Sequence, residues 1–376
     1  MLPTSTFPSA PPAAPPRLEA VDALRGFALL GIWLVHFLTK FVGQRGDGTG
    51  PAGLLSAGEM AVRLGIDTFV VGKFFSIFSL LFGLGFALQL RSAGAKGLPY
   101  TVRFVWRLAL LGAFGWLHRL LFTFEILHAY AVVGLLLVLV YRWRNGWLLL
   151  TSALLFVGGL CFAYWLAPAT VLFNRVFGEA AGSFLVDEFS GFRVFSIAAL
   201  FVLGLYLGRR DAFADTPANR VFFNRILVVA AVVFLGLRLA YSQLAAALGA
   251  SLAIRFYEVF FTLKSLVVSA LYVAGLVQLY RQPLLRRALA WLGPLGRMGL
   301  TTYVLQSLCL LLFAWYCQHY VGPAPIPLKW VLVAAALLFA AQAAAAHGWL
   351  RRFRYGPLEW LWRSATYWQW QPLRRG

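Results

Sequence analysis

The hydrophobic positions of this chain fall into long unbroken runs, and short polar segments separate them. A run of about twenty apolar residues is the length that an α-helix needs to cross a bilayer. Ten such runs cover residues 22–42, 66–90, 104–122, 125–141, 146–166, 192–208, 222–242, 257–280, 298–318 and 328–348. The pattern predicts an all-α polytopic membrane protein with about ten transmembrane helices.

Lys and Arg are distributed unevenly between alternate sides of these runs. With the N-terminus in the cytoplasm, 22 basic residues fall in inner segments and eight in outer segments. Cytoplasmic loops of membrane proteins carry the excess of basic residues, so the chain is predicted to be N-in and C-in. The same rule accounts for the net charge of +20, and nucleic acid is therefore not expected as a partner.

Composition excludes a soluble multidomain enzyme. Of the 376 residues, 61% are hydrophobic and only 12% are charged. This share of charged residues is about half that of a soluble domain. Three regions are expected: a disordered, Pro-rich cytoplasmic tail (1–20), a transmembrane domain (21–348) and a Trp-rich interfacial segment (349–376). The three cysteines lie in apolar runs, and neither a disulfide framework nor a metal site is predicted.

Ionisable side chains inside a bilayer are costly, so each of them needs a partner or a function. Seven from the first four predicted spans are expected at one depth near the outer leaflet: His36, Asp67, Lys73, His118, Arg119, Glu125 and His128. Taken singly, His36 also fits an interfacial histidine, and Lys73 also fits a side chain that extends to the outer headgroups.

His118 and Glu125 stand seven residues apart where the chain is expected to reverse direction. Basic residues at Arg107 and Arg142 bound a stretch that is long enough for two short helices, so the turn falls near residues 119–126 on the outer side. A carboxylate beside an imidazole can orient a general base. The alternative is a polar patch that seals the tip of the hairpin, and spacing alone leaves both interpretations open.

Five strings together resemble the YeiB-type bacterial membrane proteins, within the wider transmembrane acyltransferase group. They are RLEAVDALRGFALLGIWLVH (17–36), GKFFSIFSLLFGLGFALQL (72–90), GWLHRLLFTFEILHAYAVVG (115–134), GRMGLTTYVLQS (296–307) and YGPLEWLWRSATY (355–367). The resemblance runs over nearly the whole chain. It implies a bacterial inner-membrane protein of acyltransferase-like fold, surrounded by lipid.

The resemblance also implies a reaction. In that group an acyl chain moves from a coenzyme A thioester, as co-substrate, to a hydroxyl or amine of an envelope sugar, lipid or small metabolite, with no permanently bound cofactor. The presumed catalytic histidine corresponds to His118. The aspartate of the family's DIL element is replaced here by Glu125, which keeps the acid with a longer reach.

These observations predict roles for the candidate residues. His118 is the candidate base and Glu125 its orienting acid; the substrate-binding candidates are His36, Asp67, Lys73, Arg119 and His128, and the donor-binding candidates are Arg25, Arg103 and Arg107. The three arginines also fit the positive-inside rule, and Arg25 could pair with Asp22 at i,i+3.

Two further functions compete with acyl transfer. A transporter or a lipid- or solute-binding protein would use Arg238 and Lys264 within the second half. A structural protein would use a homo-oligomer interface, for which Gly204 and Gly208 offer a small-x3-small pair.

Overall fold

The ordered elements of the protein are helices. The computed structural model describes residues 18–41, 57–94, 100–122, 125–177, 191–322 and 326–375. The first helices are α1 (Glu19–Phe41), α2 (Ala57–Phe69), α3 (Phe74–Gly94), α4 (Thr101–Arg119), α5 (Leu127–Val140), α6 (Asn145–Phe177) and α8 (Gly191–Arg209). They are followed by α9 (Pro217–Tyr280), α10 (Pro283–Leu289), η2 (Ala290–Leu292), α11 (Gly293–Arg297), α12 (Gly299–Tyr316), the π-helical turn η3 (Cys317–Val321), α13 (Leu328–Arg352) and α14 (Pro357–Tyr367). The predicted all-α class is confirmed.

Six helical stretches of the described chain are long and apolar enough to cross a membrane. They are Glu19–Phe41, Met60–Gly94, Pro217–Leu244, Val259–Tyr280, Gly299–Val321 and Leu328–Arg352, and Leu127–Val140 and Asn145–Cys161 are shorter apolar helices. A multi-pass membrane protein follows from these helices. All ten predicted runs fall largely within helix, but the number of crossings and their orientation stay predictions.

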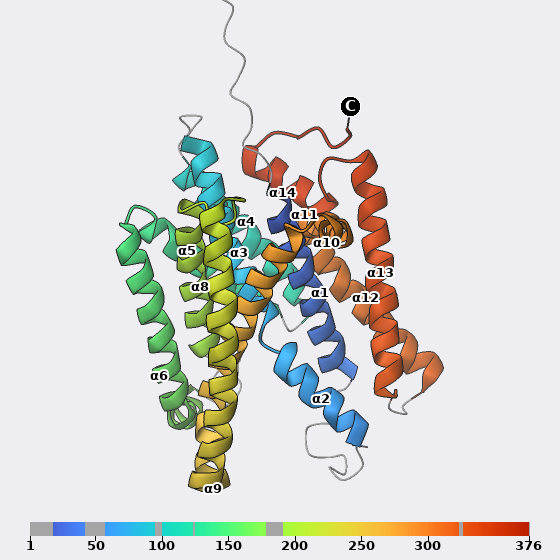
Figure 1. Ribbon diagram of the computed structural model, residues 1–376. Helices are drawn as coiled ribbons and strands as arrows, with labels where there is room; N and C mark the ends of the chain where they lie inside the picture. The colour runs from blue at the N-terminus through green and yellow to red at the C-terminus, as the bar shows by residue number, and fades with distance from the viewer. Residues whose placement is uncertain are drawn as a thin grey trace, which may run out of the picture.

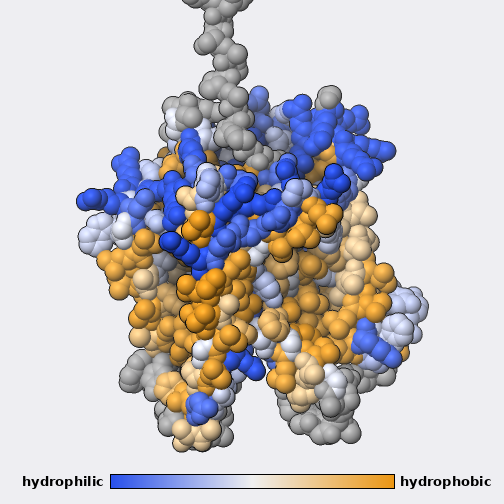
Figure 2. All heavy atoms as spheres, viewed as in Figure 1, coloured by the Kyte–Doolittle hydropathy of each residue, from blue (hydrophilic) through white to orange (hydrophobic). Residues whose placement is uncertain are grey.

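Apolar side chains form a broad band across the face that Figure 2 shows, and hydrophilic side chains gather at one end of it. This end holds α10, α11 and α14 (Figure 1). Arg91 of α3 forms an ion pair with Asp211 there, at 2.7 Å. The arrangement agrees with the inner face that the distribution of basic residues predicts.

The two expected spans at 222–242 and 257–280 form one helical element, α9. A straight helix of 64 residues would be about 96 Å long. Instead, Gln278 donates to the backbone oxygen of Arg220 at 2.8 Å, so the element folds back on itself. Figure 1 shows the yellow arm descending and the orange arm returning toward α10.

The expected span at 66–90 is interrupted between α2 and α3. Gly72 has a φ of +83°, which glycine adopts without steric cost. The buried ammonium of Lys73 donates to the backbone oxygens of Asp67, at 2.8 Å, and Val71, at 2.5 Å. Lys73 therefore satisfies carbonyl groups that the broken helix leaves without helical partners.

α3 and α8 pack so closely that glycine is required at the contact. A Cβ atom on Gly204 would lie 2.1 Å from the backbone oxygen of Leu80, and one on Gly83 would lie 2.0 Å from that of Phe201. A Cβ on Gly208 would lie 2.4 Å from the Cβ of Ala87. The Gly204–Gly208 pair thus serves a contact within the chain, in contrast to the oligomer interface that was one interpretation of its spacing.

The C-terminal segment packs against the rest of the chain at the inner end. The Trp362 indole of α14 donates to the backbone oxygen of Arg107 at 3.2 Å, and the Arg107 guanidinium lies 4.3 Å from the centre of the Trp362 ring. The predicted boundary at 348 falls inside α13, which continues to Arg352. Of the predicted tail, residues 1–17 lie outside the described residues, and α1 begins at Glu19.

Candidate active site

The site is built around the turn between α4 and α5. α4 ends as the amides of Leu121 and Phe122 both donate to the backbone oxygen of His118, at 2.9 Å. α5 then returns close to α4, because Gly115 has no side chain: a Cβ there would lie 2.6 Å from the backbone nitrogen of His128. The predicted reversal between residues 119 and 126 agrees with these helix ends.

Glu125 joins the turn to the imidazole of His118. Its Oε1 accepts from the amides of Ile126, at 2.8 Å, and Leu127, at 2.5 Å, which are free at the start of α5. Its Oε2 contacts Nδ1 of His118, and both side chains are almost completely buried. The N-terminus of α5 stabilises the negative charge of the carboxylate, and the carboxylate in turn fixes the imidazole ring.

The second ring nitrogen of His118 has no hydrogen-bond partner among the described residues. This atom, Nε2, is buried. Because an ionised Glu125 can only accept, Nδ1 carries the proton and Nε2 keeps the lone pair. An imidazole that is oriented at one nitrogen and unprotonated at the other has the geometry of a general base.

His36 and Tyr303 complete the surroundings of His118. The Tyr303 ring of α12 lies 5.2 Å from the His118 ring, and the Phe122 ring lies 6.0 Å from it. The His36 ring of α1 lies 4.9 Å from Phe122 and 6.1 Å from Tyr303. His36 therefore shares two aromatic neighbours with His118, although the two residues are distant in sequence.

The length of α5 gives the depth of this site. Its 14 residues span about 21 Å, and the hydrocarbon core is about 30 Å thick. With the end of α5 at the inner surface, the turn lies about two-thirds of the way across the bilayer. This placement rests on the predicted orientation of the helices, so the depth of the pair in the membrane stays a prediction.

The remaining substrate-binding candidates lie in two places. Arg119 is the last residue of α4, and His128 lies in the first turn of α5 opposite Gly115. Asp67 and Lys73 lie at the α2–α3 break, where the Lys73 ammonium is used by backbone oxygens. The structure thus brings His36 to His118, and joins Asp67 to Lys73 at a separate point of the fold.

A cavity of about 270 Å³ leads from the inner end toward the His118 pair. Its inner end is lined by Arg25, Arg107, Arg297 and Glu359. The opposite end of the cavity, toward His118, is lined by Ile126, Leu127, Tyr130 and Tyr303. Tyr303 both lines the cavity and lies against His118, so this ring links the cavity wall to the imidazole.

Two of the three donor-binding candidates, Arg25 and Arg107, line this cavity. Arg25 also forms the expected ion pair with Asp22, at 3.1 Å. Arg103 is not among the lining residues, and its guanidinium lies 5.1 Å from the centre of the Tyr367 ring. The structure thus divides the three arginines into two that face the cavity and one that does not.

Glu359 is a cavity residue that the sequence analysis did not single out. It accepts hydrogen bonds from the amides of Leu300, at 2.6 Å, and Thr301, at 3.0 Å. Burial raises the pKa of Glu359, and the hydrogen bonds from Thr301 and Leu300 oppose this shift only in part. A carboxyl group that ionises less readily leaves the charge of the neighbouring arginines less compensated.

Tyr303 also escaped the sequence analysis as a site residue, although it lies within the string GRMGLTTYVLQS that carries the family resemblance. A tyrosine in an apolar run was the available signal, because a buried phenol hydroxyl usually needs a hydrogen-bond partner.

Arg238 and Lys264, the candidates for transport, line neither this cavity nor the larger one between α6 and α9. Among the described residues no cluster of His, Cys, Asp or Glu could hold a metal ion.

Substitutions of Glu125 should separate its two roles. Glu125→Gln keeps an acceptor for the α5 amides but cannot balance the charge of an imidazolium. We therefore expect near-normal stability and a decrease in kcat of up to roughly 10²-fold. Glu125→Ala also removes the acceptor and should cost about 1 kcal/mol of unfolding free energy. Thermal unfolding measures the effect on stability, and the rate of the thioester reaction that the family resemblance implies measures the effect on kcat.

The exposed Glu19, which pairs with Arg286, provides the control for Glu125. Glu19→Gln should change neither the unfolding temperature nor kcat appreciably. Full activity of a folded Glu125→Gln variant would contradict a role for the carboxylate in the reaction.

The comparisons with known proteins bring similarity without an assigned activity. The chain is 26% identical to the uncharacterized protein YxaH of Bacillus subtilis, over 96% of both chains. It is 28% identical to an uncharacterized 39.9 kDa protein in the amylase 3′ region of Bacillus acidopullulyticus, over 95% of this chain and 96% of that protein. No solved structure matches the chain.

A protein-family model described as "Protein of unknown function (DUF418)" matches residues 207–369. The matched segment comprises the end of α8 and the helices α9 to α14, and therefore includes Tyr303 and Glu359. The two relatives align with almost the whole chain, so their similarity also covers α4, α5 and the turn between them, where His118 and Glu125 lie. The C-terminal part of this multi-pass membrane protein is thus similar to DUF418, a YeiB-like membrane family.

Proposed function

We propose that this protein is an acyltransferase of the bacterial inner membrane that uses His118 as its general base. An acceptor hydroxyl or amine gives its proton to Nε2 of His118 as it attacks the carbonyl carbon of a thioester. Glu125 stabilises the resulting imidazolium through Nδ1. The C–S bond then breaks, His118 returns the proton to the thiolate, and the acceptor leaves as an ester or amide.

The observation that carries this proposal is the state of the buried imidazole. Nδ1 is held by a buried carboxylate and Nε2 has no hydrogen-bond partner in the described structure. A histidine that only sealed the hairpin would be expected to satisfy both nitrogens, because an unpaired buried polar atom costs about 1–3 kcal/mol. Such an atom is retained where a reactant supplies the missing partner.

The arginine-lined end of the cavity supports a donor that enters from the cytoplasm. Arg25 and Arg107 offer guanidinium groups suited to phosphate oxygens. A cavity of about 270 Å³ accommodates an extended arm more readily than a nucleotide, so the nucleotide would stay at the inner end. The thioester reaches His118 only after the Tyr303 ring turns aside, a gating motion of a kind that is common in enzymes.

A second candidate function rests on the α2–α3 break. Interrupted membrane helices are typical of the substrate sites of secondary transporters. Here the charged group at the break, Lys73, already donates to two backbone oxygens. The geometry at His118 therefore favours acyl transfer over transport or simple solute binding.

The first experiment measures thioester consumption by the purified protein in lipid vesicles. Acetyl-, octanoyl- and palmitoyl-coenzyme A are supplied with an extract of envelope sugars and lipids, and released thiol and acylated products are quantified. We expect release of thiol above the rate of protein-free vesicles, together with a new ester or amide. Absence of both with every donor would contradict the proposal.

Arg107 and Arg103 provide a matched pair for the donor site. Arg107→Gln should raise the KM for an acyl-coenzyme A about tenfold, because a hydrogen bond to a charged group contributes about 1.5 kcal/mol. Arg103→Gln should leave this KM unchanged, since Arg103 does not line the cavity. Steady-state kinetics on the two variants measure the difference.

An acyl-N-acetylcysteamine thioester, which lacks phosphates, distinguishes charge recognition from a structural effect. Arg107→Gln should not alter the KM for this shorter donor. An equal increase for both donors would show that Arg107 acts by holding α14 in place through Trp362.

A further inference from the structure

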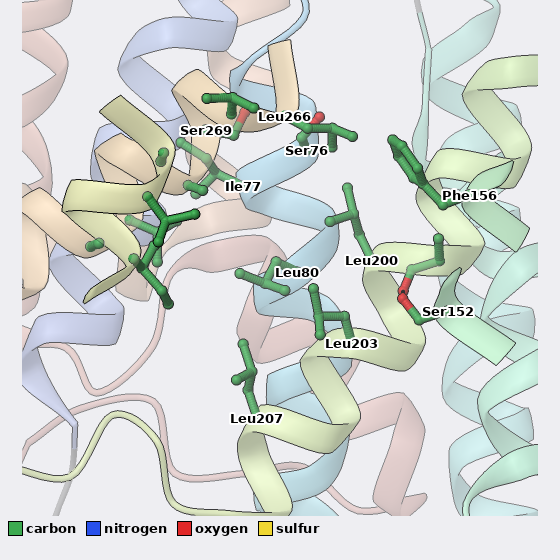
Figure 3. Close-up of a pocket in the computed structure, with 18 of the residues that line it drawn as sticks. Ser76, Ile77, Leu80, Ser152, Phe156, Leu200, Leu203, Leu207, Leu266 and Ser269 are labelled. Carbon is green, nitrogen blue, oxygen red and sulfur yellow. Dashed lines mark hydrogen bonds between the residues drawn. The ribbon is translucent and has the colours of Figure 1, made fainter. Parts of the chain in front are cut away.

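A second, larger cavity lies on the other side of α3 from the His118 site. Its volume is about 750 Å³, within the range of small-molecule sites, and α3, α6, α8 and both arms of α9 line it. Figure 3 shows Leu80 of α3 and Leu200, Leu203 and Leu207 of α8 around the same space. No step of the proposed reaction uses this cavity.

Among the described lining residues, the interior of this larger cavity offers no free polar group. Its three serines all donate to backbone oxygens: Ser76 to Gly72 at 3.3 Å, Ser152 to Ala199 at 2.8 Å, and Ser269 to Lys73 at 2.9 Å. All other lining residues except Arg225 are apolar. The ligand part that fits the interior is therefore hydrocarbon.

The cavity opens between α6 and the first arm of α9. Lining residues on these two helices are exposed: Leu149 by 40%, Val157 by 55%, Val229 by 61% and Val233 by 41%. Residues on the opposite wall, such as Ile77 and Ala274, are fully buried. Because exposed apolar side chains of a membrane protein face lipid, the opening gives onto the bilayer.

One charged side chain, Arg225 of α9, lies among the lining residues. Nearby basic residues are engaged: Arg220 pairs with Asp215 at 2.9 Å, and Arg209 donates to the backbone oxygen of Trp143 at 2.6 Å. Arg225 is exposed, and no described residue forms an ion pair with it. Arg225 lies about two turns from the start of α9, on the predicted cytoplasmic side.

We propose that this cavity binds an anionic phospholipid of the cytoplasmic leaflet. An acyl chain enters between α6 and α9 and fills the apolar interior, and the phosphate lies against the guanidinium of Arg225. An unfilled space of this size would deprive its walls of dispersion contacts. Charge complementarity selects an anionic headgroup, because each basic residue near the membrane surface contributes to the attraction of anionic lipids.

The test compares the phospholipids that remain with the protein after purification in a mild detergent. Lipids are extracted, identified by mass spectrometry and expressed per chain. The wild-type protein should carry an anionic phospholipid in stoichiometric amount, enriched over its share of the host membrane. Arg225→Gln should lower this retention roughly fivefold.

Two further variants identify the binding place. Ala153→Trp puts an indole at the exposed opening of the cavity and should remove most of the bound lipid. Arg144→Gln removes an exposed charge of the same inner region that does not line the cavity, and should change nothing. Elution as a single species and an unchanged unfolding temperature in excess lipid show that each variant is folded.

Several results would overturn the proposal. Wild-type protein without phospholipid, or with neutral lipid or detergent only, contradicts an anionic ligand. If the folded Arg225→Gln and Ala153→Trp variants retain as much anionic phospholipid as the wild-type protein, this cavity is not the place of binding. The outcome does not depend on the proposed reaction, because α3 separates the cavity from His118.

Discussion

Replacement of His118 by alanine should abolish acyl transfer while the protein stays folded. Among the described residues of the site, His118 alone has one ring nitrogen held by a carboxylate and the other buried without a hydrogen-bond partner. Proton transfer by a positioned base contributes roughly 10²–10⁴-fold to a rate, and we expect a loss in this range. The measurement is the rate of thiol release from the acyl-coenzyme A that the wild-type protein consumes best.

His347→Ala is the matched control for this experiment. His347 lies on α13, where its Nδ1 contacts the backbone oxygen of Ala343 at 2.8 Å. It does not line the cavity of about 270 Å³ that leads toward His118. This variant should keep the wild-type rate. A folded His118→Ala protein that still acylates acceptors at the wild-type rate would eliminate the proposed mechanism, and the membrane fold alone would stand.

His118 and Glu125 could be paired from the sequence because the constraint that joins them is local. Basic residues at both ends of a short apolar stretch force a reversal, and a seven-residue spacing then brings the two side chains to the same turn. Tyr303 and Glu359 could not be found in this way. They come from α12 and α14, and only the packing of distant helices brings them to the cavity.

The fold was predictable to the extent that hydropathy determines it. Runs of apolar residues predicted helices at almost all the right places, because any segment in lipid must satisfy its backbone internally. The break at Gly72 was missed, since a glycine and a lysine hardly alter the hydropathy of a long run. The break directs the ammonium of Lys73 to backbone oxygens, and the substrate-binding role of Lys73 stays a prediction.

Replacement of Gly204 by leucine should prevent α3 and α8 from packing. Even the first side-chain atom would lie 2.1 Å from the backbone oxygen of Leu80, where no flexible side chain can give way. Overpacking of a core typically costs about 1–3 kcal/mol, and a clash with backbone should reach the upper end or more. We expect little monodisperse protein in detergent and a clearly lower unfolding temperature, with Gly204→Ala between this variant and the wild type.

Gly236→Leu is the control for Gly204, because nothing lies within 4 Å of a Cβ at this position of α9. It should fold like the wild-type protein. Since α3 forms a wall of both cavities, a Gly204 variant that is rescued enough to be purified should lose activity and bound lipid together. An unfolding temperature unchanged by Gly204→Leu would mean that the two helices do not pack through their backbones, and both cavities would then have different walls.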